Sequence, residues 1–412
     1  MTERSPAIPA AGADRLAADL DARLAADDRL REQRYPGPSV ERQPVHTVYV
    51  PADRYTARTT ADWGQAARLA LDEAGPLSGF DEVAAAVLDK LTREPIEDLR
   101  IDFEDGYGVR ADEVEDADVR AAARALADPA ARPAFSGIRI KSFEGPVRAR
   151  ALRTLRLFLD TLLAAGPLPS GFRITLPKVT SVEQVSAMVH VCAVLEESYG
   201  LTAQSLRFEI QVETPQAILG AEGRALIAPM IHAAAGRCAG VHYGTYDYSA
   251  AIGIAAAWQS LEHPAADYAK AVLQVAAAGT GVPVCDGSTN LLPVGDPETV
   301  RERWALHARL VRRSLERGFY QGWDLHPAQL PTRHAATFTF YREGMVAAVG
   351  RLSTYLSRSA SGILDEPATA RALAAYLVRG LDCGAFDEAE LSTRSRAAGL
   401  ELDRAALDRL VR

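Results

Sequence analysis

Short apolar runs alternate with Ala- and Leu-rich amphipathic stretches along most of the chain. The apolar runs predict eight strands, at residues 46–50, 98–103, 137–142, 172–177, 207–212, 238–244, 282–285 and 319–325. The stretches between them have helical spacing and predict helices at residues 60–74, 115–127, 147–165, 181–199, 217–235, 263–278 and 297–317. Strict alternation over eight units predicts an α/β protein with a (β/α)8 TIM barrel. A doubly wound open sheet is the weaker alternative, because no GxGxxG motif follows the first strand.

The two ends of the chain lie outside this alternation. We expect residues 1–45 to form an N-terminal extension whose helix, over 13–34, packs across the outside of the barrel. Residues 46–335 are expected to be the catalytic barrel domain. Residues 336–412 are expected to form a C-terminal helical segment that serves as a lid or an oligomerisation arm, with a flexible linker at 358–363.

Composition narrows the class of protein. The 412 residues are 48% hydrophobic and 24% charged, which is typical of a soluble globular enzyme. The net charge of −8, without any block of Lys or Arg, argues against a nucleic-acid partner. The four cysteines form no CxxC or CxxH pair, so we expect reduced thiols in a cytoplasmic protein. No apolar run reaches the ~18 residues of a membrane span, so we expect no membrane association.

The predicted strands end in charged residues. In a parallel barrel all strands end at one rim, where active sites are built. The charged residues at or just after the predicted strand ends are Asp102, Glu104, Asp105, Arg139, Lys141, Lys178, Glu213, Asp247, Asp286 and Asp324. So many unneutralised charges would cost several kcal/mol each, which indicates a metal ion and an anionic substrate. Glu213 and Asp247, after strands five and six, suit Mg²⁺ because it prefers oxygen ligands.

The other candidates each have an alternative interpretation. Arg139 can hold a carboxylate in two places, which makes it the candidate anchor for an organic acid. Lys178 either balances the acidic residues or forms a Schiff base, which would require a desolvated amine. Asp105 and Asp286 are catalytic candidates or helix caps. His326 either contacts the substrate or packs against a loop, and the acidic turn at 382–388 supplies a base or caps a helix.

Seven short motifs, in this order and spacing, resemble the citrate lyase β-subunit-like branch of the HpcH/HpaI aldolase superfamily, which includes malyl-CoA and citramalyl-CoA lyases. They are VYVPADR at 48–54, IDFEDG at 101–106, RIKS at 139–142, LPKV at 176–179, VETP at 212–215, YGTYDYS at 243–249 and LHPAQ at 325–329. The resemblance covers roughly residues 47–330.

The resemblance implies roles for the candidate residues. Glu213 and Asp247 would bind Mg²⁺, with Mn²⁺ as an alternative. Arg139, Asp105 and Lys178 would be catalytic. Arg139 would also bind the substrate, together with Glu104, Thr214, Pro215 and His326. The implied activity is that of a carbon–carbon lyase or aldolase that cleaves a small carboxylated 2-oxo acid or an acyl-CoA through a metal-stabilised enolate.

Three alternatives stay open. A malate-synthase-like enzyme would condense glyoxylate with an acyl-CoA at the same site. Phosphoenolpyruvate chemistry uses a similar enolate. A catalytically silent barrel would bind an acidic metabolite or a protein partner. The resemblance also implies a homo-oligomer, either a trimer or a hexamer, whose ligand is a small carboxylic acid or a coenzyme A thioester.

Overall fold

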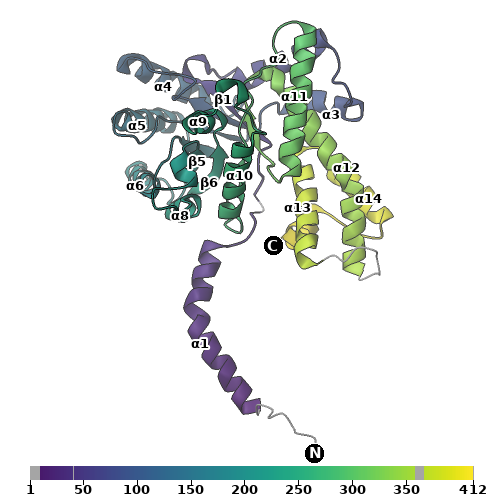
Figure 1. Ribbon diagram of the computed structural model, residues 1–412. Coiled ribbons are helices and arrows are strands. Elements are labelled where there is room, and N and C mark those ends of the chain that lie inside the picture. The colour runs from purple at the N-terminus through teal and green to yellow at the C-terminus, as the bar shows by residue number, and fades with distance from the viewer. Residues whose placement is uncertain (1–9, 40, 358–365, 412) are drawn as a thin grey trace, which may run out of the picture.

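Eight parallel strands form the centre of the protein. The computed structural model describes residues 10–39, 41–357 and 366–411. The strands are β1 (His46–Pro51), β2 (Asp98–Asp102), β3 (Phe135–Arg139), β4 (Phe172–Leu176), β5 (Arg207–Val212), β6 (Cys238–Tyr243), β7 (Val284–Cys285) and β8 (Gly322–Asp324). They pair in the order β7-β6-β5-β4-β3-β2-β1-β8, and a bridge between Cys285 and Gln321 brings β7 to the start of β8. The predicted (β/α)8 barrel is confirmed (Figure 1).

Helices follow the strands around the barrel. The barrel helices that are longer than one turn are α2 (Thr59–Ala74), α3 (Ala84–Arg93), α4 (Asp112–Ala127), α5 (Arg148–Ala165), α6 (Val182–Tyr199), α8 (Ile227–Ala233), α9 (Thr245–Ala251), α10 (Pro264–Ala277) and α11 (Pro297–Glu316). The long α12 (Leu330–Ser357) follows β8, and the expected domain boundary at 335/336 therefore lies inside a helix. The C-terminal helices are α13 (Pro367–Cys383), α14 (Glu388–Ala397) and α15 (Arg404–Val411).

The strands alternate between apolar residues that face the helices and polar residues that face the barrel axis. On β5, Phe208, Ile210 and Val212 are fully buried in the main hydrophobic core. Glu209 lies between them in the sequence and accepts a hydrogen bond from Arg100 of β2, which is not a neighbouring strand. Such a contact must cross the barrel. The interior of this barrel is therefore charged, where the branched apolar residues usual in the fold would be expected.

The N-terminal helix was expected to pack on the barrel, and this expectation is wrong. Helix α1 (Ala10–Arg34) projects away from the body of the protein (Figure 1). Its leucines, Leu16, Leu20, Leu24 and Leu30, are 41–51% exposed. The segment that follows the helix contacts the barrel, where Gly37 donates a backbone hydrogen bond to Gly279.

The C-terminal helices lie at the opposite end of the barrel from the expected active site. Val378 and Asp382 of α13 and Val411 of α15 share a cavity with Arg173 and Arg207, at the starts of β4 and β5. Helices α13 and α15 therefore lie away from the C-terminal rim of their own barrel, and a role as a lid or as an oligomerisation arm stays a prediction. Asp387 caps α14 by accepting from the backbone of Glu390 at 2.7 Å, as the capping interpretation predicted. The predicted linker at 358–363 lies outside the described residues.

Two further expectations concern the cysteines and the membrane. All four cysteines are free and buried. No helix in the described ranges combines the length and the apolar character needed to cross a membrane.

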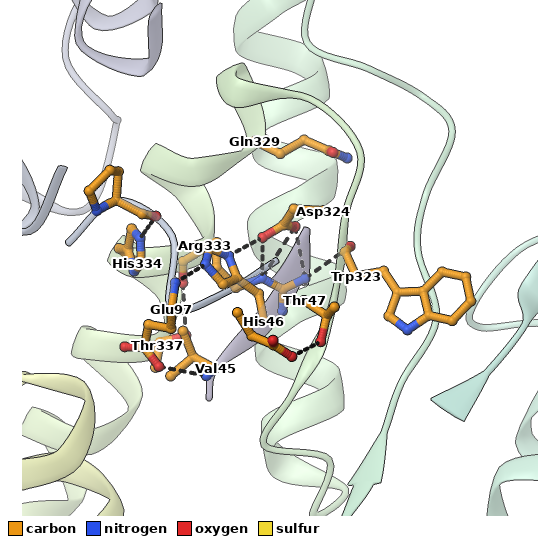
Figure 2. A network of polar contacts seen from close by, with 12 residues as sticks. Val45, His46, Thr47, Glu97, Trp323, Asp324, Gln329, Arg333, His334 and Thr337 are labelled. Atoms are coloured by element: carbon orange, nitrogen blue, oxygen red, sulfur yellow. Dashed lines mark hydrogen bonds and ion pairs between the residues drawn. The ribbon is translucent and has the colours of Figure 1, made fainter. Parts of the chain in front are cut away.

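A buried polar network joins β1 and β8 to the outer helices (Figure 2). Asp324 has a fully buried side chain and binds His46 at 2.7 Å, His307 at 3.1 Å and Arg333 at 3.0 Å. The Nε2 atom of His46 accepts from the backbone N–H of Glu97, so its Nδ1 is the donor to Asp324. His334, the residue after Arg333 in α12, contacts the carbonyl of Pro95 at 3.0 Å.

We expect this region to make the fold sensitive to acid. Burial lowers the pKa of His334 to about 3 from an ordinary 6.5. Below pH 6.5 the unfolded chain gains a proton that the folded chain does not take up, so stability falls as the pH falls from 6.5 towards 3. One such group contributes up to about 1.4 kcal/mol per pH unit. His334→Gln keeps a hydrogen-bond donor but cannot titrate, and its urea midpoint should depend less steeply on pH in this range.

The exposed His190 provides the control for this experiment. His190→Gln should leave the pH dependence of the wild type unchanged. If His334→Gln also lost stability between pH 6.5 and 4 as steeply as the wild type, titration of His334 would not be a cause of the acid sensitivity.

Candidate active site

The candidate site lies at the C-terminal rim of the barrel. Arg139 is the last residue of β3, Lys178 follows β4 and Glu213 follows β5. Asp247 lies in the first turn of α9, directly after β6. The loop after β2 contributes Glu104 and Asp105. Because all strands are parallel, these residues reach the same end of the barrel, as the sequence predicted.

Arg139 is held rigidly. Its guanidinium donates two hydrogen bonds of 2.7 Å to the carboxylate of Asp102, on the neighbouring strand β2. It also stacks on the ring of Tyr49 at 4.7 Å. Its Nη1 atom lies 3.4 Å from the amide oxygen of Gln211 and 3.5 Å from Glu104. With one edge fixed by Asp102, the remaining N–H groups are directed towards the acidic residues of the rim.

Lys178 lies at the centre of the acidic residues. Its Nζ atom is 2.6 Å from Glu104, 2.7 Å from Asp105, 2.8 Å from Asp247 and 4.0 Å from Glu213. Its backbone N–H also donates to Glu213 at 2.9 Å. The φ angle of Lys178 is 50°, which costs roughly 1–2 kcal/mol for a residue with a side chain. The surrounding contacts must outweigh this cost, so the backbone at Lys178 is held in place by its neighbours.

The electrostatics of the rim reflect an excess of negative charge. Burial raises the pKa of Glu213 to about 8, against the opposing effects of Lys178 and Arg139. Burial lowers the pKa of Lys178, but Glu213 and Glu104 outweigh it and hold the pKa above its ordinary value. An ammonium that stays protonated is a poor nucleophile. The Schiff-base alternative is therefore not supported by this arrangement.

Three predicted substrate residues do not converge on this cluster. Thr214 donates from its hydroxyl to the carbonyl of Val179 at 2.7 Å, and Pro215 begins the short helix α7 (Pro215–Ile218), so both shape the loop beside Glu213. The ring of His326 accepts from the backbone of Ala328 and caps the turn after β8. It also lines a groove against α2, on the outside of the barrel. The packing interpretation of His326 is the one that the geometry supports.

Three charged strand ends were wrongly expected at the rim. Asp286 binds Lys270 of α10 at 3.1 Å, and Asp324 binds Arg333 of α12 at 3.0 Å, so both point towards helices. Lys141 binds Glu115 of α4 at 3.1 Å. Each of these three side chains is neutralised by a partner on a helix, which leaves the acidic cluster described above as the charged part of the rim.

Two residues of the site were missed in the sequence. Gln211 bridges the site, because its amide oxygen faces Arg139 and its amide nitrogen donates to Glu213. Tyr49 provides the ring beneath Arg139. The signal for Gln211 was present, since residues 209, 211 and 213 are polar at every second position of one strand. No signal identified Tyr49, which reads as an ordinary aromatic residue in an apolar strand.

Comparisons with known proteins support the fold. The structure of Haloferax volcanii malate synthase in its magnesium/glyoxylate complex matches with a TM-score of 0.51 at 11% identity, over 89% of this chain and 97% of that one. CitE from Mycobacterium tuberculosis with magnesium, acetoacetate and coenzyme A matches with 0.49 at 18% identity, over 84% and 100%. An HpcH/HpaI aldolase/citrate lyase family protein from Burkholderia cenocepacia matches with 0.41 at 14% identity, over 73% and 94%.

At 11% identity the match to the malate synthase structure shows a shared fold and nothing more. The comparison with curated proteins gave no match. The family described as a domain of unknown function, DUF6986, matches residues 24–410, and the chain therefore belongs to this family.

Proposed function

We propose that the protein is a Mg²⁺-dependent carbon–carbon lyase or aldolase that acts on a small carboxylated 2-oxo acid or its acyl-CoA counterpart. One observation carries this proposal. Five acidic side chains gather around two cations at the rim, an excess of three acidic groups, and burial there raises the pKa of Glu213 to about 8, so the cluster is not fully ionised at neutral pH; the acidic side chains are those of Asp102, Glu104, Asp105, Glu213 and Asp247, and the cations are Arg139 and Lys178. A divalent cation would offset most of this excess.

The donor set fits a hard cation in its chemistry. Glu213 and Asp247 offer carboxylate oxygens, and the Oδ2 atom of Asp247 already faces a positive charge, because it lies 2.8 Å from the Lys178 ammonium. Among the described residues no three His, Cys, Asp or Glu side chains are already arranged around one metal position. The carboxylates instead surround the ammonium of Lys178, so Mg²⁺ would bind Glu213 and Asp247 once this ammonium moves aside. A bound Mg²⁺ would polarise a substrate carbonyl as a Lewis acid.

Residues of this chain would bind the substrate, stabilise the developing negative charge and transfer the proton. Arg139 would bind the substrate carboxylate through its N–H groups that do not face Asp102. Lys178 would donate a hydrogen bond to an oxygen that gains negative charge. The side chain of Asp105 is 54% exposed and hydrogen-bonded to Lys178, which makes it the candidate for moving a proton between substrate and solvent.

The first test is a calorimetric titration of metal-stripped protein with Mg²⁺, alone and then with pyruvate, oxaloacetate, glyoxylate or acetyl-CoA. We expect Mg²⁺ to bind, and Glu213→Gln and Asp247→Asn each to weaken its binding at least about tenfold, because each removes a charged ligand. Mn²⁺ serves as a second probe. The exposed Glu222, changed to Gln, is the matched control and should bind like the wild type.

The outcomes separate the alternatives. Metal-dependent binding of pyruvate or oxaloacetate favours the lyase, whereas combined binding of glyoxylate and acetyl-CoA favours the condensing enzyme. Absence of metal binding in the wild type, or equal binding in Glu213→Gln, would contradict the proposal and favour a silent barrel. A homo-oligomer stays an expectation from the resemblance.

A further inference from the structure

A second polar cavity lies at the N-terminal mouth of the barrel, at the opposite end from the candidate active site. It encloses about 260 Å³. The first residues of several strands form its floor, and the segment that leads into β1 closes it together with α13 and α15. The arginines that line the cavity are Arg42, Arg100, Arg173, Arg207 and Arg379. Nothing in the proposed function uses this cavity.

Two of these arginines are already neutralised. Arg100 binds Asp98 and Glu209 inside the barrel. Arg42 binds Glu94 and Glu97 at 2.9 Å each. The cavity is also lined by Asp382 and Asp408, but both bind Arg404, at the outer side. These carboxylates therefore pair with arginines other than Arg173, Arg207 and Arg379. The exception is the exposed Glu41, which binds Arg207.

The remaining three arginines lack firm counter-charges. Arg173 donates to the carbonyl of Phe172 at 3.0 Å and stacks on Phe135 at 5.9 Å, and no carboxylate of the described residues binds it. Arg379 stacks on the ring of Tyr320 at 4.1 Å, and among the described residues no carboxylate pairs with it either. Arg207 binds Glu41 at 3.2 Å, but the Glu41 side chain is 70% exposed, which makes the pair weak.

The arrangement is costly without a ligand. Burial, followed by repulsion from Arg207 and Arg100, lowers the pKa of Arg173. The Nε atoms of Arg42 and Arg207 are buried without hydrogen-bond partners. Guanidinium groups recognise carboxylate and phosphate through paired N–H bonds. An anion in the cavity would supply both the missing charge and the missing acceptors.

We propose that this cavity binds a small polyanion, with at least two carboxylate or phosphate groups, through Arg173 and Arg207 and with Arg379 at its margin. The cavity volume limits the ligand to a metabolite-sized molecule, and its position makes the site independent of the rim. The proposal does not rest on the proposed catalytic function.

The test uses pyrophosphate and citrate as probes, titrated calorimetrically into the full chain at low ionic strength without divalent metal, up to about 10 mM. We expect one of the two to bind, and the one that does identifies phosphate or carboxylate as the recognised group. Arg173→Met and Arg207→Met should each weaken binding at least about tenfold. Arg224→Ala, an exposed arginine, should bind the probe like the wild type.

Two further measurements keep the result unambiguous. Arg139→Lys alters the rim and should leave probe binding unchanged, which distinguishes this site from the catalytic one. Without ligand, Arg173→Met should melt no lower than the wild type, because it removes an uncompensated charge. Binding that survives in Arg173→Met, binding that is lost in Arg139→Lys, or no binding of either probe would overturn the proposal.

Discussion

Arg139→Lys should lower kcat/KM for the substrate by about a hundredfold to a thousandfold while the protein remains folded. The substitution keeps a positive charge next to Asp102, so the buried carboxylate retains a partner. It removes the planar guanidinium that binds Asp102 with two bonds of 2.7 Å and still presents N–H groups to the rim. Loss of one such preorganised donor from a transition state typically costs this much.

The measurement is steady-state kinetics with the 2-oxo acid identified by titration, together with its affinity for the metal-loaded protein. Arg153→Lys is the matched control, because Arg153 pairs with Asp116 on the outer helices. Its turnover should equal that of the wild type. If Arg139→Lys bound and turned over the substrate normally, Arg139 would have only a structural role as the partner of Asp102.

The strands were predictable because their outer faces carry a clear apolar signal. In β5 the pattern of Phe208, Ile210 and Val212 gave the observed bounds 207–212. In β3 the apolar residues continue beyond the strand, so the prediction of 137–142 lay too late and the strand ends at Arg139. This difference matters for function, because Arg139 then lies at the rim itself.

The predicted helix at 217–235 is wrong for a local reason. The structure has two short helices there, α7 and α8, separated by a turn. Gly223 adopts a φ angle of 70° and donates to the carbonyl of Gly220 at 2.9 Å. Glycine at both turn positions removes the helical preference that the flanking apolar residues suggested.

The sequence placed the acidic cluster correctly but not the direction of every strand-end side chain. Side chains alternate between the barrel axis and the helices, so one residue of register decides where a charge lies. In β5 a long alternating run fixes that register. Strand β8 has only three residues. Trp323 faces the interior, where its indole N–H lies 3.2 Å from His242, and because side chains alternate, Asp324 must face the helices. A strand this short has too few residues for an alternating pattern that could predict which way the Asp324 side chain points.

The outward direction of Asp324 leads to the largest stability effect that we expect. Asp324→Asn should lower the free energy of unfolding by about 3–5 kcal/mol, which is the usual cost of breaking a buried ion pair from one side. Its carboxylate is fully buried and holds Arg333 and His46 (Figure 2). It also binds His307 of α11. Burial alone would raise the pKa of Asp324, but Arg333 and the two histidines outweigh it and hold that pKa far below its ordinary value.

Urea unfolding at neutral pH measures this loss. Asp89→Asn is the matched control, because Asp89 makes an exposed pair with Arg93 and its loss should leave the urea midpoint close to that of the wild type. The double variant Asp324→Asn with Arg333→Met removes the unpaired guanidinium as well, and it should recover part of the stability. A single variant as stable as the wild type would show that the histidines and the peptide groups around Arg333 compensate for the lost charge. The contacts of Asp324 would then specify the position of β8 against α11 and α12 without stabilising the barrel.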